Sequence, residues 1–338
     1  MSRRELTPVL FLDGGLGTSL EDNYGVKFGK HTPLWSSHLL VDDPDTLRTC
    51  QRDFGNVPVD ILSTATYQVS AEGFARTKTS DHPHGISRSE ILPFLNLAIS
   101  IAEEVKAPEA RVALSLGSYG SCMVPSQEYS GKYDGEHDSI EQLCDWHRDR
   151  IGLFNQIDRL ESRVGFVAFE TVPKLIEIKA IRKLFTHAPS SSSNARPILH
   201  GSLPFWISCV FPNDDYTLPD GSDIDQVVDA MLDPDASDVF PWGIGINCTK
   251  INKLPELVRM YSTAVSRLAK AGRLTAQPSL VLYPDGTNGE VYDTTTMTWH
   301  APNNQQKSMV SLIIKGIVII LSNREAECVA DFMGASTC

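Results

Sequence analysis

The chain has 338 residues, of which 41% are hydrophobic and 21% are charged, and its formal net charge at pH 7 is −12. These values are ordinary for a globular protein and exclude a disordered chain, a collagen-like chain and a coiled coil. The excess of 42 acidic over 30 basic residues argues against nucleic acid as a partner, because nucleic-acid binding normally requires a basic surface. No apolar run approaches the roughly 20 residues of a membrane helix, so we expect no membrane partner either.

Eight short apolar runs recur along the chain, and turn-forming or polar residues follow most of them. They span residues 9–12, 59–62, 112–117, 165–171, 198–202, 243–248, 280–284 and 316–320. Because the runs are apolar nearly throughout, without alternation, they predict strands buried on both faces, which is typical of a parallel sheet. Between them, hydrophobic residues with a helical period predict helices, for example over residues 91–102, 143–157 and 257–268.

Strands that alternate with helices predict a (β/α)8 barrel of the TIM type, with a doubly wound open sheet as the structural alternative. No linker divides the chain, so we expect a single α/β domain over residues 1–338. We interpret residues 119–138 as a loop at the end of the barrel where active sites are built. The serine-rich stretch 190–194 is interpreted as a loop on the opposite face.

Seven unevenly spaced cysteines do not form the framework of a small secreted protein. The N-terminal residues contain no apolar stretch long enough for a signal peptide, so a cytoplasmic location is expected. In that compartment cysteines serve more often as metal ligands, catalytic groups or core residues than as cross-links. Cys50, Cys144 and Cys209 fall in apolar patterns and are interpreted as structural, whereas the role of Cys122 is left open.

Polar residues gather where the predicted strands end, which is where barrel enzymes place their functional groups. The candidates at these positions are Asp13, Gly14, Gly15, Thr66, Gln68, Glu170, Asn247 and Cys248. Glu170 ends a strongly apolar run, a costly place for a charge unless a partner or ligand meets it. Asp13 and Cys248 have simpler alternatives, because Asp-Gly is a common turn sequence and single cysteines often fill cores.

Four short motifs, taken in order and spacing, resemble the homocysteine S-methyltransferase family over roughly residues 8–299. They are Asp-Gly-Gly-Leu-Gly-Thr at 13–18, Ala-Thr-Tyr-Gln at 65–68, Phe-Glu-Thr-Val-Pro at 169–173 and Gly-Ile-Asn-Cys at 245–248. The likeness is closest to enzymes that use S-methylmethionine or S-adenosylmethionine. The resemblance implies a homocysteine-binding (β/α)8 barrel that makes methionine from homocysteine and such a sulfonium methyl donor.

The resemblance also implies which residues bind the amino-acid substrate. Asp13 and Glu170 would hold the amino group of homocysteine. Backbone amides near Gly14 and Gly15 would hold its carboxylate, and Thr66 would lie beside the substrate.

The cofactor that the resemblance implies is Zn²⁺ held by three cysteines. Cys248 would be the first ligand, and Asn247 would shape the mouth next to the metal. The family places the other two cysteines in a Gly-Gly-Cys-Cys motif after the eighth strand, where this sequence has Leu-Ser-Asn-Arg at 321–324. Since the nearest cysteines, Cys328 and Cys338, are not adjacent, residues 300–338 form a divergent C-terminal segment and the zinc site is incomplete.

The implied chemistry depends on a sulfur anion. A free thiol with a pKa of about 8.5 is mostly protonated at neutral pH, whereas the thiolate is the nucleophile. Three cysteine ligands leave the fourth position of a zinc ion open for the substrate sulfur, which then binds deprotonated. We therefore predict a homocysteine S-methyltransferase. The alternative is a metal-free, catalytically impaired barrel that binds homocysteine or another amino acid without methyl transfer.

Overall fold

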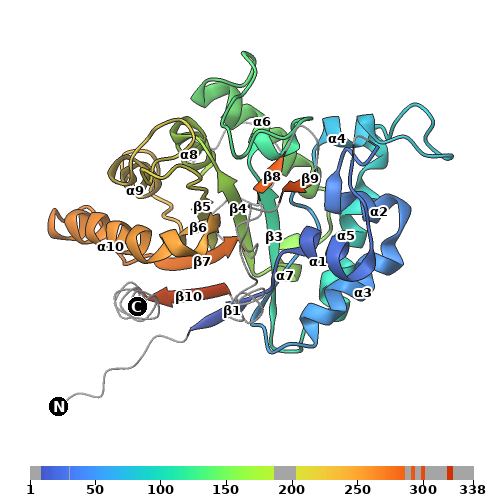
Figure 1. Cartoon of the computed structure of the whole chain (residues 1–338), viewed down its shortest axis with the longest axis horizontal. Helices are drawn as coiled ribbons and strands as arrows, with labels where there is room; N and C mark the ends of the chain where they lie inside the picture. Colours follow the sequence, from blue (N-terminus) through green and yellow to red (C-terminus); the bar gives the residue numbers. More distant parts are fainter. Residues whose placement is uncertain are drawn as a thin grey trace.

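The structure of the chain is a computed structural model that describes residues 9–29, 31–185, 203–285, 291–293, 298–300 and 318–322. Eight strands form a closed barrel in the order β1, β10, β7, β6, β5, β4, β3, β2 (Figure 1). Their bounds are β1 Leu10–Leu12, β2 Ile61–Ser63, β3 Arg111–Gly117, β4 Phe166–Val172, β5 Phe205–Cys209, β6 Gly243–Lys250, β7 Ser279–Asp285 and β10 Val318–Ser322. Two further strands, β8 Val291–Asp293 and β9 Thr298–His300, pair with each other in an antiparallel ribbon.

Helices follow most of the strands in the described part of the chain. The α-helices are α1 Leu16–Tyr24, α2 Leu39–Asp42, α3 Pro44–Gly55, α4 Ala71–Arg76, α5 Leu92–Val105, α6 Ile140–Phe154, α7 Leu160–Arg163, α8 Leu175–Leu184, α9 Ile224–Met231 and α10 Leu254–Lys270. Short 3₁₀ helices are η1 Trp35–His38, η2 Arg88–Glu90, η3 Tyr119–Cys122 and η4 Ile251–Lys253. This arrangement confirms the TIM-type barrel in preference to the open sheet, together with the three helices predicted above.

Local sequence explains where the helices begin. At the start of α3, the Asp43 carboxylate accepts the backbone N–H of Thr46 at 3.1 Å, and Pro44 occupies the first turn. A side-chain acceptor and a proline at these positions are both typical of a helix N-terminus. Leu47 and Cys50 then face the core from the same side of α3, so Cys50 has the structural environment predicted for it.

Two of the predicted strands differ from the structure. The fifth strand is Phe205–Cys209, whereas residues 198–202 lie outside the described residues. The eighth strand, β10, is shifted by two residues from the predicted 316–320 and runs antiparallel to both of its neighbours, β1 and β7. The barrel therefore has seven parallel strands and one reversed strand. A uniformly apolar strand satisfies a barrel in either direction, so composition alone does not determine its direction.

The inner face of the barrel changes from apolar to polar along the strands. An apolar cluster lies toward the beginning of the strands and contains Leu12, Ile61, Ala113, Phe166, Ala168, Trp206 and Val281. Because side chains alternate between the two faces of a strand, a residue two positions later points the same way. Ser63, Ser115, Glu170, Ser208 and Tyr283 hold these next positions. The interior thus has an apolar floor under a polar layer.

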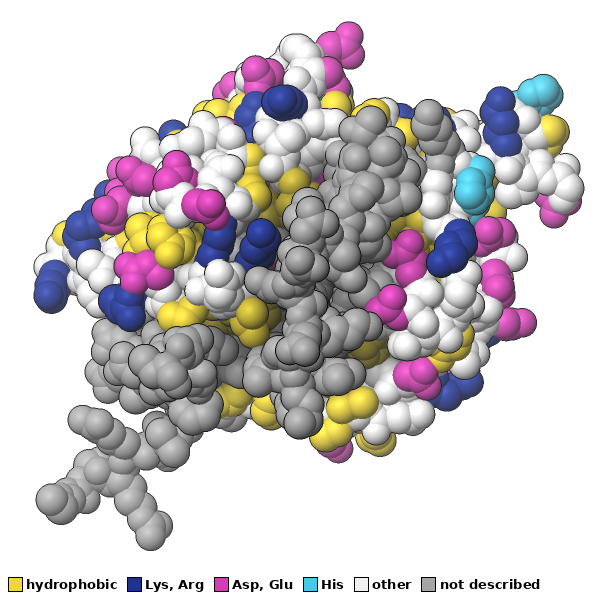
Figure 2. Space-filling model, in the orientation of Figure 1, with side chains coloured by type: hydrophobic (Ala, Val, Ile, Leu, Met, Phe, Trp, Pro, Cys, Tyr) yellow, Lys and Arg dark blue, Asp and Glu magenta, His cyan; other side chains and the backbone are white. Residues whose placement is uncertain are grey.

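The outer surface carries charges of both signs. On the face drawn in Figure 2, acidic and basic side chains of the described residues are interspersed. The helices of the described ranges include none that is both long enough and apolar enough to cross a membrane.

Close packing between β6 and β7 leads to a first prediction. A Cβ atom added at Gly245 would lie 2.3 Å from the backbone oxygen of Val281, so the two strands would have to separate. We expect Gly245→Ala to lower the free energy of unfolding by roughly 1–3 kcal/mol, as overpacked cores do. Urea denaturation of the purified variant measures this change.

The matched control is Gly152→Ala in α6, where nothing lies within 4 Å of the added Cβ atom. Alanine has the higher helix propensity, so this variant should be about as stable as the wild type or more stable by up to about 1 kcal/mol. Equal stability of the two variants would contradict the close contact between β6 and β7.

Candidate functional site

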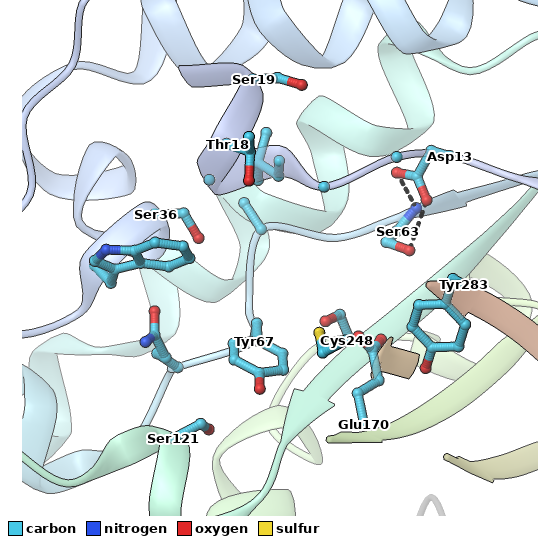
Figure 3. Close-up of a pocket in the computed structure, with 18 of the residues that line it drawn as sticks. Asp13, Thr18, Ser19, Ser36, Ser63, Tyr67, Ser121, Glu170, Cys248 and Tyr283 are labelled. Carbon is cyan, nitrogen blue, oxygen red and sulfur yellow. Dashed lines mark hydrogen bonds between the residues drawn. The ribbon is translucent and has the colours of Figure 1, made fainter. Parts of the chain in front are cut away.

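A cavity of about 680 Å³ opens where the parallel strands end, among the loops that follow them (Figure 3). Small-molecule sites typically occupy about 300–1,000 Å³. In the close-up, Glu170, Cys248 and Tyr283 lie together, and Asp13 points toward Ser63. The cavity therefore brings together candidates from β1, β4 and β6 that lie far apart in the sequence.

Asp13 follows β1 and is only 6% exposed. Its carboxylate accepts the backbone N–H of Ser63 at 2.9 Å and the hydroxyl of Ser63 at 2.8 Å. Since Ser63 ends β2, this carboxylate joins two neighbouring strands and does not merely cap its own Asp-Gly turn. Burial raises the pKa of Asp13 to about 7, although the hydrogen bonds from Ser63 oppose the rise.

A β-bulge positions Glu170. The pairing of β4 with β5 shifts after Phe169, so Glu170 and Thr171 have no regular partner in β5. Bulges of this kind re-aim side chains next to active sites. Burial raises the pKa of Glu170 to about 8; the hydroxyl of Ser115 opposes the rise, and the charge of Asp13 adds to it. The two carboxylates are thus close enough to repel each other when both are ionised.

A second bulge positions Cys248, because the pairing of β6 with β7 shifts after Asn247. Thr171 and Cys248 both adopt positive φ, 57° and 49°, which is strained for a β-branched residue such as threonine. The Asn247 amide accepts the backbone N–H of Thr171 at 2.8 Å, and it donates to the Thr171 hydroxyl at 2.6 Å and to the Cys248 sulfur at 3.3 Å. Asn247 therefore holds the two strained strand ends together.

The described residues around Cys248 do not make a three-cysteine zinc site. Burial raises the pKa of this thiol to about 12, so it is neutral at pH 7. Within the described ranges, no group of three or more His, Cys, Asp or Glu side chains is arranged to hold a metal ion. Cys50 also borders the cavity but is 1% exposed, within α3. A zinc site needs about four ligands, and a single thiol does not fit that requirement.

The direction of β10 bears on the two missing cysteines. Leu321 and Ser322 belong to this strand, and Ser322 pairs with Ser279 at the start of β7. They lie at the end of the barrel opposite Cys248, because β10 is antiparallel to its neighbours. In the Gly-Gly-Cys-Cys motif these two positions are the glycines, and the two cysteine positions, Asn323 and Arg324, lie outside the described residues. Cys328 and Cys338 lie outside the described residues.

Gly14 and Gly15 line the cavity as predicted substrate-binding positions. Gly15 is the N-cap of α1, and no side chain forms a capping hydrogen bond there. The first backbone N–H groups of a helix lack partners within the helix and carry the positive end of its dipole. The start of α1 can therefore bind an anion such as a carboxylate.

Thr66 is the predicted substrate residue that does not line the cavity. It is fully buried, and its hydroxyl donates to the backbone oxygen of Ser115 at 2.7 Å. Its neighbours Tyr67 and Gln68 line the cavity instead. The buried guanidinium of Arg150 fixes this loop by donating to the backbone oxygens of Thr66 at 3.3 Å and Tyr67 at 2.6 Å.

Several cavity residues are not among the predicted site residues. They are Ser63, Tyr67, Ser115, Glu128, Tyr129 and Tyr283. Ser63, Ser115 and Tyr283 each follow an apolar interior residue of their strand by two positions, so the two-residue period of a strand is the signal for them. The other three lie in loops, where no such period exists.

The fold and the position of the cavity define a TIM-type barrel protein with its site at the C-terminal ends of the strands. The family model described as homocysteine S-methyltransferase matches residues 10–326, and the chain belongs to this family. Homocysteine S-methyltransferase YbgG of Bacillus subtilis is 27% identical over 313 residues, which cover 87% of this chain and 82% of the relative. The Escherichia coli homocysteine S-methyltransferase is 29% identical over 294 residues, covering 86% and 82%.

Two further similarities extend this comparison. A selenocysteine Se-methyltransferase of Brassica oleracea is 29% identical over 308 residues, covering 85% of this chain and 75% of the relative. The crystal structure of the homocysteine methyltransferase MmuM from Escherichia coli, in its metallated form, matches with a TM-score of 0.57 and 24% identity. That match covers 81% of this chain and 83% of MmuM, and it supports the barrel fold.

The two buried carboxylates predict how stability depends on pH. Burial raises the pKa of Asp13 from 3.8 to about 7 and that of Glu170 from 4.5 to about 8, so the folded chain binds these protons more tightly than the unfolded chain. Their contribution to stability is complete below about pH 4 and is lost as the pH rises toward 8. The double variant Asp13→Asn/Glu170→Gln should therefore lose less stability than the wild type between pH 5 and 8.5.

Thermal melts of both proteins across this pH range test the prediction. Comparison with the variant removes the contribution of all other titrating groups. Parallel profiles for the two proteins would contradict the raised pKa values.

Proposed function

We propose that this chain transfers a methyl group from a sulfonium donor, S-methylmethionine or S-adenosylmethionine, to the sulfur of homocysteine, giving methionine. The S–CH₃ bond of the donor breaks and its electron pair stays on the departing sulfur, while the homocysteine sulfur forms the new bond and its thiol proton goes to solvent. Family membership supports the reaction class. The observation that carries the proposal is the pair of buried carboxylates, Asp13 and Glu170.

Asp13 and Glu170 suit the amino group of an amino acid. Both are at least nine-tenths buried, and within the described ranges neither forms an ion pair with a basic side chain. The charge of the Arg150 guanidinium favours ionised Glu170, but burial outweighs it. A bound ammonium group supplies three N–H donors and a positive charge, which lowers both raised pKa values and removes the repulsion between the carboxylates.

The rest of an amino acid fits the same half of the cavity. The uncapped start of α1 at Gly15 would receive its carboxylate. With both charged ends bound in this way, the side chain would extend toward Cys248, which lies beside Glu170 in Figure 3. Oriented binding of this kind aligns the substrate sulfur with the methyl group, which is the main requirement of a displacement reaction.

Activation of the substrate thiol is the step that the described residues do not supply. The resemblance implies zinc, but one neutral thiol does not fit a three-cysteine site. This observation favours a second candidate function, in which a metal-free barrel binds homocysteine or another amino acid without transferring a methyl group. The two functions share the binding half of the cavity and differ in turnover and in bound zinc.

The leading proposal predicts that the purified full chain, supplied with zinc, forms methionine from homocysteine and S-methylmethionine.

Removal of one negative charge in Asp13→Asn or Glu170→Gln should lower kcat/KM for homocysteine by roughly tenfold to a hundredfold, since hydrogen bonds to charged groups are lost. Chromatographic measurement of methionine gives the rates. Glu136→Gln, which changes an exposed carboxylate of the loop after β3, is the matched control and should leave them unchanged.

Elemental analysis and homocysteine binding separate the two candidate functions. Turnover with stoichiometric zinc supports the transferase. Homocysteine binding without zinc or turnover supports the binding protein, whereas a chain that does not bind homocysteine contradicts both.

A further inference from the structure

Glu128, in the loop between β3 and α6, is a buried carboxylate that the acceptor half of the site does not use. Its side chain is 7% exposed and lines the cavity, and its Oε2 atom has no hydrogen-bond partner. Burial raises the pKa of Glu128 to about 7, and the hydroxyl of Ser126 opposes the rise. A buried acceptor without a partner is costly, so a ligand that supplies a positive charge would stabilise it.

The loop that carries Glu128 is fixed to the helical layer of the barrel. The Glu177 carboxylate in α8 accepts the backbone N–H of Tyr119 at 2.7 Å, the ring N–H of His147 at 2.9 Å and the hydroxyl of Tyr133. Gly120 allows the loop to fold back closely, because a Cβ atom at this position would lie 2.9 Å from the backbone nitrogen of Glu128. The carboxylate of Glu128 is thus held at the cavity before any ligand binds.

Glu128 lines the same cavity as Tyr67, Tyr129 and Cys248. Its charge acts on Tyr67 and Tyr129, and both tyrosines also interact electrostatically with Cys248. Glu128 therefore belongs to the part of the cavity that contains Tyr67, Tyr129 and Cys248.

We propose that Glu128 binds the sulfonium charge of the methyl donor and makes the second half of the cavity selective for cationic donors. This inference rests on the function proposed above and adds a residue that recognises the donor. A second unpartnered acceptor, Oε1 of the 7%-exposed Gln68, borders the same cavity. The rings of Tyr67 and Tyr129 add to the attraction, because aromatic side chains favour onium cations.

A carboxylate at this position also distinguishes the donor from its product. The donor sulfur is positively charged before the reaction, but after the methyl group leaves it is a neutral thioether. Glu128 therefore attracts the donor and has no charge to attract in the demethylated product. Differential binding of this kind favours release of the product once the methyl group has been transferred.

Calorimetric titration of the full chain with four ligands tests the proposal. The ligands are S-methylmethionine; dimethylsulfoniopropionate, which has a sulfonium but no amino group; methionine, which has an amino group but no sulfonium; and homocysteine. For Glu128→Gln we expect Kd to rise at least about tenfold for the two sulfonium compounds, as for loss of a buried charge partner. Methionine and homocysteine should bind within about twofold of the wild type, as should all four ligands to the control Glu136→Gln.

The outcomes separate this inference from the proposed function. Retained homocysteine binding by Glu128→Gln shows that the variant is folded. If that variant binds both sulfonium compounds as the wild type does, or if only methionine binding weakens, the assignment of Glu128 is overturned and the acceptor site stands. If the wild-type chain binds no sulfonium compound, this inference fails together with methyl transfer. If it also fails to bind homocysteine, the acceptor site fails as well.

Discussion

The repulsion between two carboxylates buried at the mouth of one barrel is the constraint on which the site depends. Asp13 and Glu170 come from strands that are not neighbours, yet the closed barrel brings them within electrostatic reach of each other. Hydrogen bonds from Ser63 to Asp13 and from Ser115 to Glu170 favour the ionised carboxylates and offset part of the cost of burying them. Burial still outweighs these hydrogen bonds, so the pKa values of both carboxylates are raised. Such a pair is stable in a folded protein when a cation completes it, and the amino group of an amino acid is a cation of the right size.

Backbone strain at the mouth has a clear structural purpose. Parallel strands in regular register would direct successive side chains alternately into and out of the barrel. The register of β4 against β5 shifts after Phe169 and that of β6 against β7 shifts after Asn247, and Asn247 ties the strained residues Thr171 and Cys248 to each other. Functional groups on two strands separated by β5 are thereby held in fixed relative positions, which a pair of unconnected loops would not achieve.

The sequence predicts the barrel and several of the residues that line its cavity, because both depend on local patterns. Apolar runs give the parallel strands, and the polar residues after them, Asp13 and Glu170, lie where a barrel places its site. The direction of β10 is not predictable in this way, since an apolar strand pairs equally well in both directions. The orientation of loop side chains is equally hard to predict from the sequence, as Thr66 and Glu128 show. Tertiary contacts decide which loop residue points into the cavity, and loops have no regular alternation from which this could be read.

The two halves of the cavity are built on different kinds of support. The acceptor half is formed by strand ends and by the start of α1, so a change there disturbs the barrel itself. Glu128 lies on a loop that side chains outside it hold in place: Glu177 accepts hydrogen bonds from Tyr119 and Tyr133, and Arg76 donates to the backbone oxygen of Cys122. Under the proposed function, exchange of this loop would alter the preference for the methyl donor, while the strand ends would keep the amino-acid site.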